Sequence, residues 1–166
     1  MIRIFGESNG IENEQIIPEG KYKDSIVKTR VNQSFFRKMI LSSYDSQCCI
    51  TGLPIKELLV ASHIIPWSQN SKTRLDPQNG LCLNSLHDKA FDQGYLTINT
   101  SYQVVISRKL ENFEQYNVKL ITDYQGSKIK LPRRFLPKQE YLNYHRKNIL
   151  GILEYSQIII FCLFLA

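Results

Sequence analysis

The sequence predicts an α+β domain, and three observations indicate that class. Apolar residues between positions 28 and 44 recur at the spacing of a helix. Two short apolar runs, at 57–64 and 80–84, have the length and composition of buried strands. A short helical pattern at 85–94 follows the second run directly, so the centre of the chain has the order strand, strand, helix.

The first helix is expected to pack one face on the core. The strand at 57–64 ends abruptly at His63, and a polar loop with two prolines, residues 66–79, separates it from the strand at 80–84. The apolar positions that give the first helix its face are Val31, Phe35, Phe36, Met39 and Ile40.

The helix at 85–94 carries boundary signals of its own. Asn84 is a suitable N-cap, and Gly94 suits the C-terminal end of the helix. Two alternating segments, 95–99 and 103–107, then predict a β-hairpin.

The length of 166 residues fits one domain with a substantial core. We expect that domain at 28–150, with a basic-ended helix at 137–150 as its last element. Residues 1–27 contain scattered glycines and a proline and are predicted to be a leader or linker. The tail at 151–166 is very apolar, but its charge-free run after Glu154 has only 12 residues. That is too short for an ordinary membrane span, so no membrane partner is expected.

The net charge of +6 and the isoelectric point near 9.1 favour a polyanionic partner. The excess lies between residues 128 and 147, which hold seven basic residues and one acid, Glu140. Such a stripe would contact phosphates and release counterions, although a solvated basic face would have the same composition. The candidate phosphate contacts are Lys128, Lys130, Arg133 and Arg134, together with Arg74 of the loop, for which a solvent-exposed charge is the alternative.

Cysteine usage indicates a reducing compartment. Cys48 and Cys49 are adjacent, no pair has CxxC spacing, and no secretory signal is visible at the N-terminus. Reduced thiols in a cytoplasm fit this pattern best, and a structural zinc cage is not supported. The remaining cysteines are Cys82 and Cys162.

Three polar residues stand at the ends of the central elements. His63 ends the first strand, Asn79 precedes the second by one residue, and His87 falls in the first turn of the helix. If the strands form a hairpin and the helix folds back, all three meet in one cleft. By itself, a lone histidine beside apolar residues is more often an ordinary half-buried residue whose ring nitrogens are satisfied.

The flanking sequence resembles the HNH endonuclease family, and the resemblance extends over residues 28–150. It implies the family's ββα-metal (His-Me finger) core, with flanking helices and a small antiparallel sheet. The segments that carry it are FFRKMILSSYDSQCCITG, ASHIIPWS, RLDPQNGLCLN, LHDKAFDQGYLTI and YLNYHR.

The resemblance also implies roles for the three polar residues. His63 would be the general base that activates water, since imidazole titrates close to neutral pH. Asn79 would brace the loop and orient His63. His87 would bind one divalent cation, Mg²⁺ first and Mn²⁺, Zn²⁺ or Ni²⁺ otherwise, which stabilises the departing oxygen. A first-turn position favours a neutral His87 ring, as metal binding requires.

One position departs from the family's pattern. Many HNH sites have an aspartate or histidine directly before the general base, and here that residue is Ser62, a poor ligand for Mg²⁺. Water or another carboxylate would complete the metal shell, with Asp92 and Asp76 as candidates. Asp88 is expected to face solvent.

The sequence therefore predicts a metal-dependent endonuclease that cuts double-stranded DNA, with restriction of foreign DNA as the implied role. One such site cuts one strand at a time, so a double-strand break would need a homodimer or two visits. Because of Ser62, the alternative is a nucleic-acid-binding module that has lost catalysis. A Cys–His hydrolase using Cys48 or Cys49 with His63 fits the composition, but no third group supports it.

Overall fold

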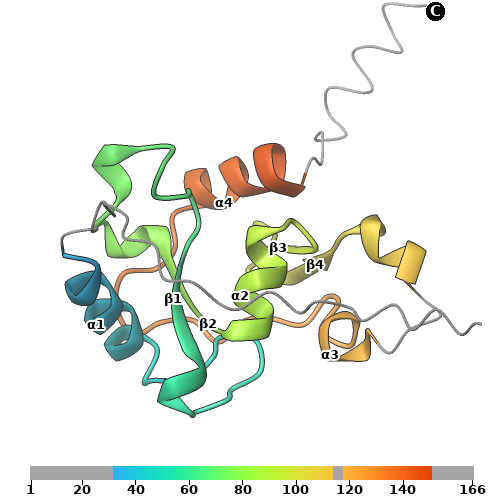
Figure 1. The fold of residues 1–166 in the computed structure, drawn as a ribbon, viewed down its shortest axis with the longest axis horizontal. Coiled ribbons are helices and arrows are strands. Elements are labelled where there is room, and N and C mark those ends of the chain that lie inside the picture. Colours follow the sequence, from blue (N-terminus) through green and yellow to red (C-terminus); the bar gives the residue numbers. More distant parts are fainter. Residues whose placement is uncertain (1–31, 114–117, 151–166) are drawn as a thin grey trace, which may run out of the picture.

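The structure is a computed structural model that describes residues 32–113 and 118–150 (Figure 1). Its helices and strands, in chain order, are α1 (Gln33–Ser43), β1 (Leu59–His63), β2 (Gly80–Asn84), α2 (Ser85–Asp92), β3 (Leu96–Ile98), β4 (Val104–Ile106), α3 (Lys119–Thr122) and α4 (Gln139–His145). A π-helical turn, Arg146–Leu150, continues α4. The predicted leader at 1–27 and tail at 151–166 lie outside the described residues.

The centre of the molecule is a β-hairpin followed at once by a helix. β1 and β2 pair antiparallel, from Leu59 opposite Asn84 to His63 opposite Gly80. α2 begins at the residue after β2 ends, so the strand–strand–helix order becomes one compact ββα unit. The α+β class and its ββα core are thus confirmed. β1 starts two residues later than predicted, because a 3₁₀ turn occupies Lys56–Leu58.

α1 covers one face of the hairpin and explains a glycine in β2. Phe36 and Ile40 are fully buried, as the helical spacing predicted. A Cβ atom at Gly80 would collide with the side chains of both. Only glycine therefore allows α1 to lie this close to the strand end beside His63.

The predicted boundaries of α2 are confirmed. The side chain of Asn84 accepts a hydrogen bond from the backbone N–H of His87 at 2.9 Å, so it caps the helix. Gly94 has a φ of +67° just past the last turn, a conformation that favours glycine. Both ends of α2 are therefore fixed by local contacts.

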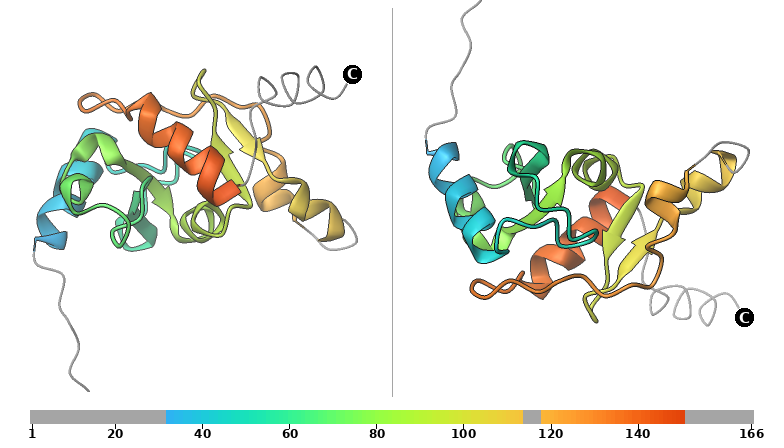
Figure 2. Two further views of the ribbon diagram at one scale, coloured as in Figure 1. Left: turned by 90° about the horizontal axis from the view of Figure 1, so that it is seen from above. Right: turned by 90° about the horizontal axis from the view of Figure 1, so that it is seen from below.

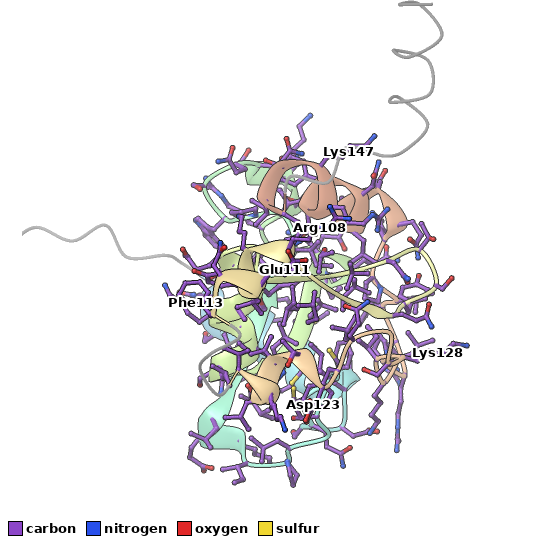
Figure 3. The ribbon with its side chains drawn as sticks, turned by 90° about the vertical axis from the view of Figure 1, so that its right-hand side faces the viewer. Arg108, Glu111, Phe113, Asp123, Lys128 and Lys147 are labelled. Atoms are coloured by element: carbon purple, nitrogen blue, oxygen red, sulfur yellow. The ribbon has the colours of Figure 1, made fainter. Side chains whose placement is uncertain are left out.

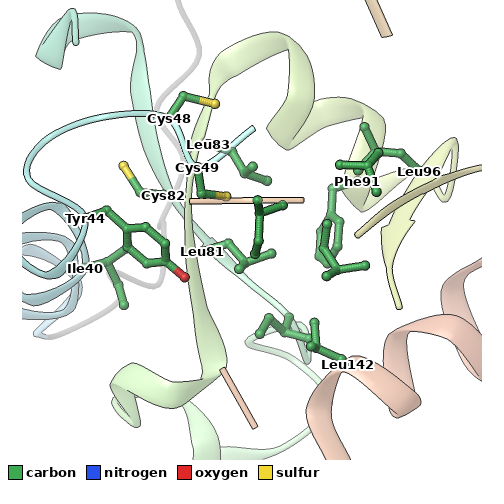
Figure 4. Packing of buried hydrophobic residues seen from close by; sticks show 14 of the residues in the cluster. Ile40, Tyr44, Cys48, Cys49, Leu81, Cys82, Leu83, Phe91, Leu96 and Leu142 are labelled. Carbon is green, nitrogen blue, oxygen red and sulfur yellow. The ribbon is translucent and has the colours of Figure 1, made fainter. Parts of the chain in front are cut away.

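A second antiparallel pair, β3 with β4, lies beyond α2 and matches the predicted hairpin in shorter form. α4 begins at Gln139, and its Leu142 enters the same core as α2 and β3. Figure 4 shows this core, in which Leu81 and Phe91 lie between the two hairpins. α3 and a 3₁₀ segment, Arg108–Phe113, were not predicted from the sequence.

Cys48, Cys49 and Cys82 are buried and free, in line with the expectation of reduced thiols. Burial is the main cause that raises the pKa of Cys82 to about 12, so this thiol has no nucleophilic character at neutral pH. In the described part of the chain, no helix is long and apolar enough to cross a membrane.

Candidate active site

The end of β1 presents His63 in a defined orientation. Its Nε2 lies 2.9 Å from the backbone carbonyl oxygen of Arg74. Because a carbonyl oxygen only accepts hydrogen bonds, Nε2 carries the proton in this contact. In the neutral ring, Nδ1 is then the nitrogen with a lone pair that can accept a proton.

Two aromatic rings hold the His63 ring in place. Phe36 of α1 stacks on it, with ring centroids 4.0 Å apart and planes 9° apart. Trp67 meets it edge-on, with centroids 5.7 Å apart and planes 85° apart. The orientation of His63 is therefore fixed by three contacts: α1 on one face of the ring, the loop at an edge, and a hydrogen bond from Nε2 to a backbone carbonyl.

Asn79 is buried completely and ties the loop between the strands together. Its side-chain oxygen accepts from the backbone N–H of Ile65 at 2.8 Å. Its amide nitrogen donates to the carbonyls of Ile65 and Thr73, at 3.1 and 3.2 Å. Since Thr73 directly precedes Arg74, whose carbonyl binds His63, Asn79 fixes the backbone that fixes the ring.

Arg74 is engaged within the same loop. Its Nε donates to the carbonyl of Trp67 at 2.8 Å, and its guanidinium lies 5.1 Å from the centre of the Trp67 ring. The side chain is half-buried. Arg74 therefore helps to hold the loop together, a structural role that was not expected from the sequence.

Asp88 approaches the end of β1, contrary to the expectation that it faces solvent. It is half-buried, and burial raises the pKa of its carboxyl group. The Ser62 hydroxyl, Lys89 and the charge of His63 act in the opposite direction on that pKa. Asp88 is thus close enough to Ser62 and His63 to interact with both.

Asp92 follows four residues later, on the same face of α2. Burial raises the pKa of the Asp92 carboxyl group, and so does the negative charge of Asp88. The two carboxylates repel each other, which is the electrostatic condition that a bound cation would relieve.

His87 has different neighbours from His63, whereas the sequence led us to expect both rings in one cleft. Its Nδ1 lies 3.0 Å from the side-chain oxygen of Asn84, and its ring meets Tyr124 edge-on at 5.2 Å between centroids. The ring is buried, its Nε2 has no hydrogen-bond partner, and burial lowers its pKa. His87 therefore projects from α2 toward Tyr124, next to α3, while Asp88 projects toward β1.

Asp76, the other candidate to complete a metal shell, already has two side-chain partners near α4. Its Oδ2 accepts from Lys138 Nζ at 3.0 Å and from the Tyr141 hydroxyl at 2.8 Å. Burial would raise the pKa of Asp76, but these hydrogen bonds, with that from the Gln78 N–H, lower it overall. Within residues 32–113 and 118–150, no group of three or more His, Cys, Asp or Glu side chains is arranged to hold a metal ion.

The basic stripe is partly neutralised. Asp45 pairs with Lys130 at 3.2 Å and with Arg133 at 2.8 Å. Lys128 lies exposed on the surface (Figure 3), and Arg134 lines a groove beside α1. The four predicted phosphate contacts therefore differ in their surroundings, and two of them already have a carboxylate partner.

The central part of the chain is similar to a known protein family. Residues 48–99 match the HNH_2 family model, described as HNH endonuclease. Residues 48–99 are thus similar to HNH endonucleases. The matched region contains β1, β2, α2 and β3, and hence the whole ββα unit.

Similarity in fold to a solved structure extends beyond the matched region. A solved structure described as the modification-dependent TagI restriction endonuclease is similar to this chain, with a TM-score of 0.52 and 19% sequence identity. The similarity covers 79% of this chain and 43% of that protein, so the chain spans less than half of its structural relative. At this identity the likeness establishes the fold alone. No functionally curated protein has a significant sequence match to the chain.

Sequence reasoning missed Asp88 and the stacking partner Phe36. A signal for Asp88 was available, because Asp88 and Asp92 are four residues apart and must share one helical face. Phe36 was assigned to the core from its spacing, and nothing in that spacing distinguishes a core phenylalanine from one that touches His63.

Proposed function

We propose that the chain is a metal-dependent HNH endonuclease that hydrolyses DNA phosphodiester bonds, with a restriction-type role in the cytoplasm. The observation that supports it is the meeting of His63, Ser62 and Asp88 at the end of the hairpin. There, a histidine fixed through Nε2 stands beside a half-buried carboxylate on α2. The match to the HNH endonuclease family supports a nuclease.

His63 is the proposed general base. As a water oxygen attacks phosphorus, Nδ1 takes a proton from that water, and the bond from phosphorus to the 3′ oxygen breaks. The positive charge that develops on the ring strengthens the hydrogen bond from Nε2 to the Arg74 carbonyl.

Asn79 is a positioning residue in this proposal. It has no role in proton transfer, because both ends of its amide are occupied by the backbone of Ile65 and Thr73. Through Thr73 it keeps the Arg74 carbonyl within reach of His63.

The residues fit a divalent cation, although not the set expected from the sequence. The similarity to HNH endonucleases implies a divalent metal ion. Asp88 and Asp92 would hold it, since two repelling carboxylates on one helix face are hard oxygen ligands of the kind Mg²⁺ prefers. The buried hydroxyl group of Ser62 lies beside Asp88 and acts on its pKa, so it faces the same region. A cation there supplies charge stabilisation at the phosphate and the departing oxygen.

His87 is not a metal ligand in this proposal. Its Nδ1 faces the side-chain oxygen of Asn84, and its Nε2 is buried on the Tyr124 side of α2. We therefore propose that Asp88, and not His87, is the second metal ligand beside Asp92. Mutation of His87 provides the comparison.

A plasmid-nicking assay tests the function. Supercoiled plasmid is incubated with the chain and Mg²⁺ or Mn²⁺, and the control is His63→Ala. We expect nicked circles from the wild-type chain, none from His63→Ala, and none when EDTA is present. Linear product at high protein concentration would indicate that two copies cut both strands.

A second candidate is a nucleic-acid-binding module without catalysis. It is favoured by Ser62 in place of a metal ligand and by the absence of a three-ligand cluster among the described residues. A shift of intact plasmid in a gel, with no nicking in either metal, would establish it in place of the enzyme.

A further inference from the structure

A groove of about 740 Å³ lies beside α1, outside the site described above. One wall is the surface of α1 that carries Phe35, Lys38 and Ser42, and the other is the segment 133–135 that leads toward α4. Figure 2 shows this orange segment beside α1 at the same end of the molecule in both views. The backbone N–H of Arg133 donates to the Ser43 carbonyl at 2.8 Å, which attaches the segment to the helix.

The groove combines cations with exposed aromatic rings. Lys38, Arg133 and Arg134 line it, against the single carboxylate of Asp45, which already pairs with Arg133. The groove therefore keeps an excess of positive charge.

Phe35 is 54% exposed and Phe135 is 41% exposed. Large aromatic residues usually bury most of their surface, so two exposed rings in one cationic groove indicate a ligand with flat faces.

Phe135 is held in an unusual backbone conformation. Its φ is +60°, in the left-handed region that bulky residues rarely adopt. The flanking chain is fixed by Gln78, whose side chain donates to the Leu136 carbonyl at 3.2 Å and whose own carbonyl accepts from the Lys138 N–H at 3.2 Å. Strained residues that the surroundings hold in place are concentrated at ligand sites.

We propose that this groove binds an unpaired stretch of the DNA substrate. Bases stack on Phe35 and Phe135, and phosphates contact Lys38 and Arg134. Stacking on aromatic side chains within a positive groove is the usual chemistry of single-strand recognition, and it needs bases that are not paired.

This inference rests on the proposed function, and α1 connects the two sites. Phe36, the residue after Phe35, stacks on His63. A strand that lies in the groove therefore contacts the same helix, α1, whose Phe36 supports the proposed general base His63.

The test measures the affinity for a fluorescein-labelled single-stranded oligonucleotide by anisotropy, in EDTA so that no cutting occurs. We expect Phe35→Ala and Phe135→Ala each to weaken binding by at least about fivefold, the lower end for loss of one stacked base. The matched control is Phe113→Ala, which removes a ring of equal exposure, 41%, at the opposite end of the molecule (Figures 1 and 3). It should leave the affinity within about twofold, below the effect of one stacked base.

The basic residues of the groove give a second measurement, which does not require that the Phe135→Ala variant folds correctly. Lys38→Gln and Arg134→Gln should each lower the salt dependence of binding by close to one phosphate contact. Lys109→Gln, an exposed lysine of the 3₁₀ segment, should not change it.

Unchanged affinity in both phenylalanine variants would overturn the proposal. So would sedimentation showing that the groove instead joins two copies of the chain, with dimers lost in Phe35→Ala. The outcome is separate from that of the plasmid assay. A chain that binds through the groove but never nicks refutes only the nuclease, and one that nicks with groove variants of normal affinity refutes only the groove.

Discussion

The rings of Phe36 and His63 lie face to face, 4.0 Å apart at their centroids and 9° from parallel. Phe36 comes from α1, outside the matched HNH region at 48–99, whereas His63 ends β1 within it. The orientation of the proposed base is thus set in part by an element outside the family match.

Replacement of Phe36 by leucine should slow nicking more than it destabilises the fold. Leucine keeps most of the buried volume, at a cost of about 1 kcal/mol, but leaves the His63 ring without its flat support. We expect kcat to fall about tenfold, equivalent to about 1.4 kcal/mol in the transition state, with KM nearly unchanged.

Phe91→Leu is the matched control for this experiment. Phe91 is equally buried and stacks in the same way on His145, with centroids 3.6 Å apart and planes 15° apart. It should lose similar stability in urea denaturation without an equal loss of kcat. Equal losses of kcat in both variants would show that Phe36 acts through general stability alone.

Asp88→Asn should remove metal-dependent activity, because it deletes one of the two proposed oxygen ligands. We expect at least about a 100-fold loss of nicking in Mg²⁺, in the range found when a group that stabilises transition-state charge is removed. Mn²⁺ titration followed by electron paramagnetic resonance should show weaker binding as well.

Two further variants serve as controls for Asp88→Asn. Asp123→Asn changes an exposed aspartate at the end of α3 and should have no effect. His87→Asn should retain more metal binding than Asp88→Asn. The opposite order would return the ligand role to His87 and refute the assignment made from the side-chain directions of α2.

Asn79→Ala should lower both stability and activity. It leaves the N–H and the carbonyl of Ile65 buried without their partner, at about 1–3 kcal/mol for each unsatisfied group. Asn148→Ala, which loses one exposed hydrogen bond to Tyr144, should leave thermal unfolding nearly unchanged. An Asn79→Ala chain of normal melting temperature would contradict the bracing role.

The sequence was sufficient for the ββα unit because its signals are local. Asn84 caps α2 through its own next turn, Gly94 ends it with a positive φ, and each strand is a continuous apolar run. The family resemblance also singled out His63 and Asn79. In the structure, His63 lies at the end of β1, and Asn79 lies in the loop before β2.

The direction of the α2 side chains was not predictable from the motif alone. His87 and Asp88 are neighbours, so a rotation of the helix by about 100° exchanges which of them faces β1. That rotation depends on tertiary packing, in which Ala90 lies against the core, and residue types do not specify this contact. Likewise, the pairing of Asp45 with Arg133 joins residues distant in the chain.

His145 should make the fold sensitive to acid. Burial is the main cause that lowers its pKa to about 4, from about 6.5 for an exposed histidine. Its Nε2 donates to the Phe91 carbonyl at 3.1 Å, and its Nδ1 lies 2.8 Å from the Thr97 hydroxyl, so the neutral ring is satisfied at both nitrogens.

The sign follows from proton binding. Between pH 6.5 and about 4 the unfolded chain binds a proton at residue 145 that the folded chain excludes, so acid favours unfolding. This contribution of His145 to the free energy of unfolding, up to about 3 kcal/mol, is fully present above pH 6.5 and is lost as the pH falls toward 4.

Urea denaturation at pH 7.5, 5.5 and 4.5 measures this contribution. His145→Gln, which keeps a donor and an acceptor but does not titrate, should show a smaller fall across this range, and an equal fall in both chains would assign the acid sensitivity to other groups.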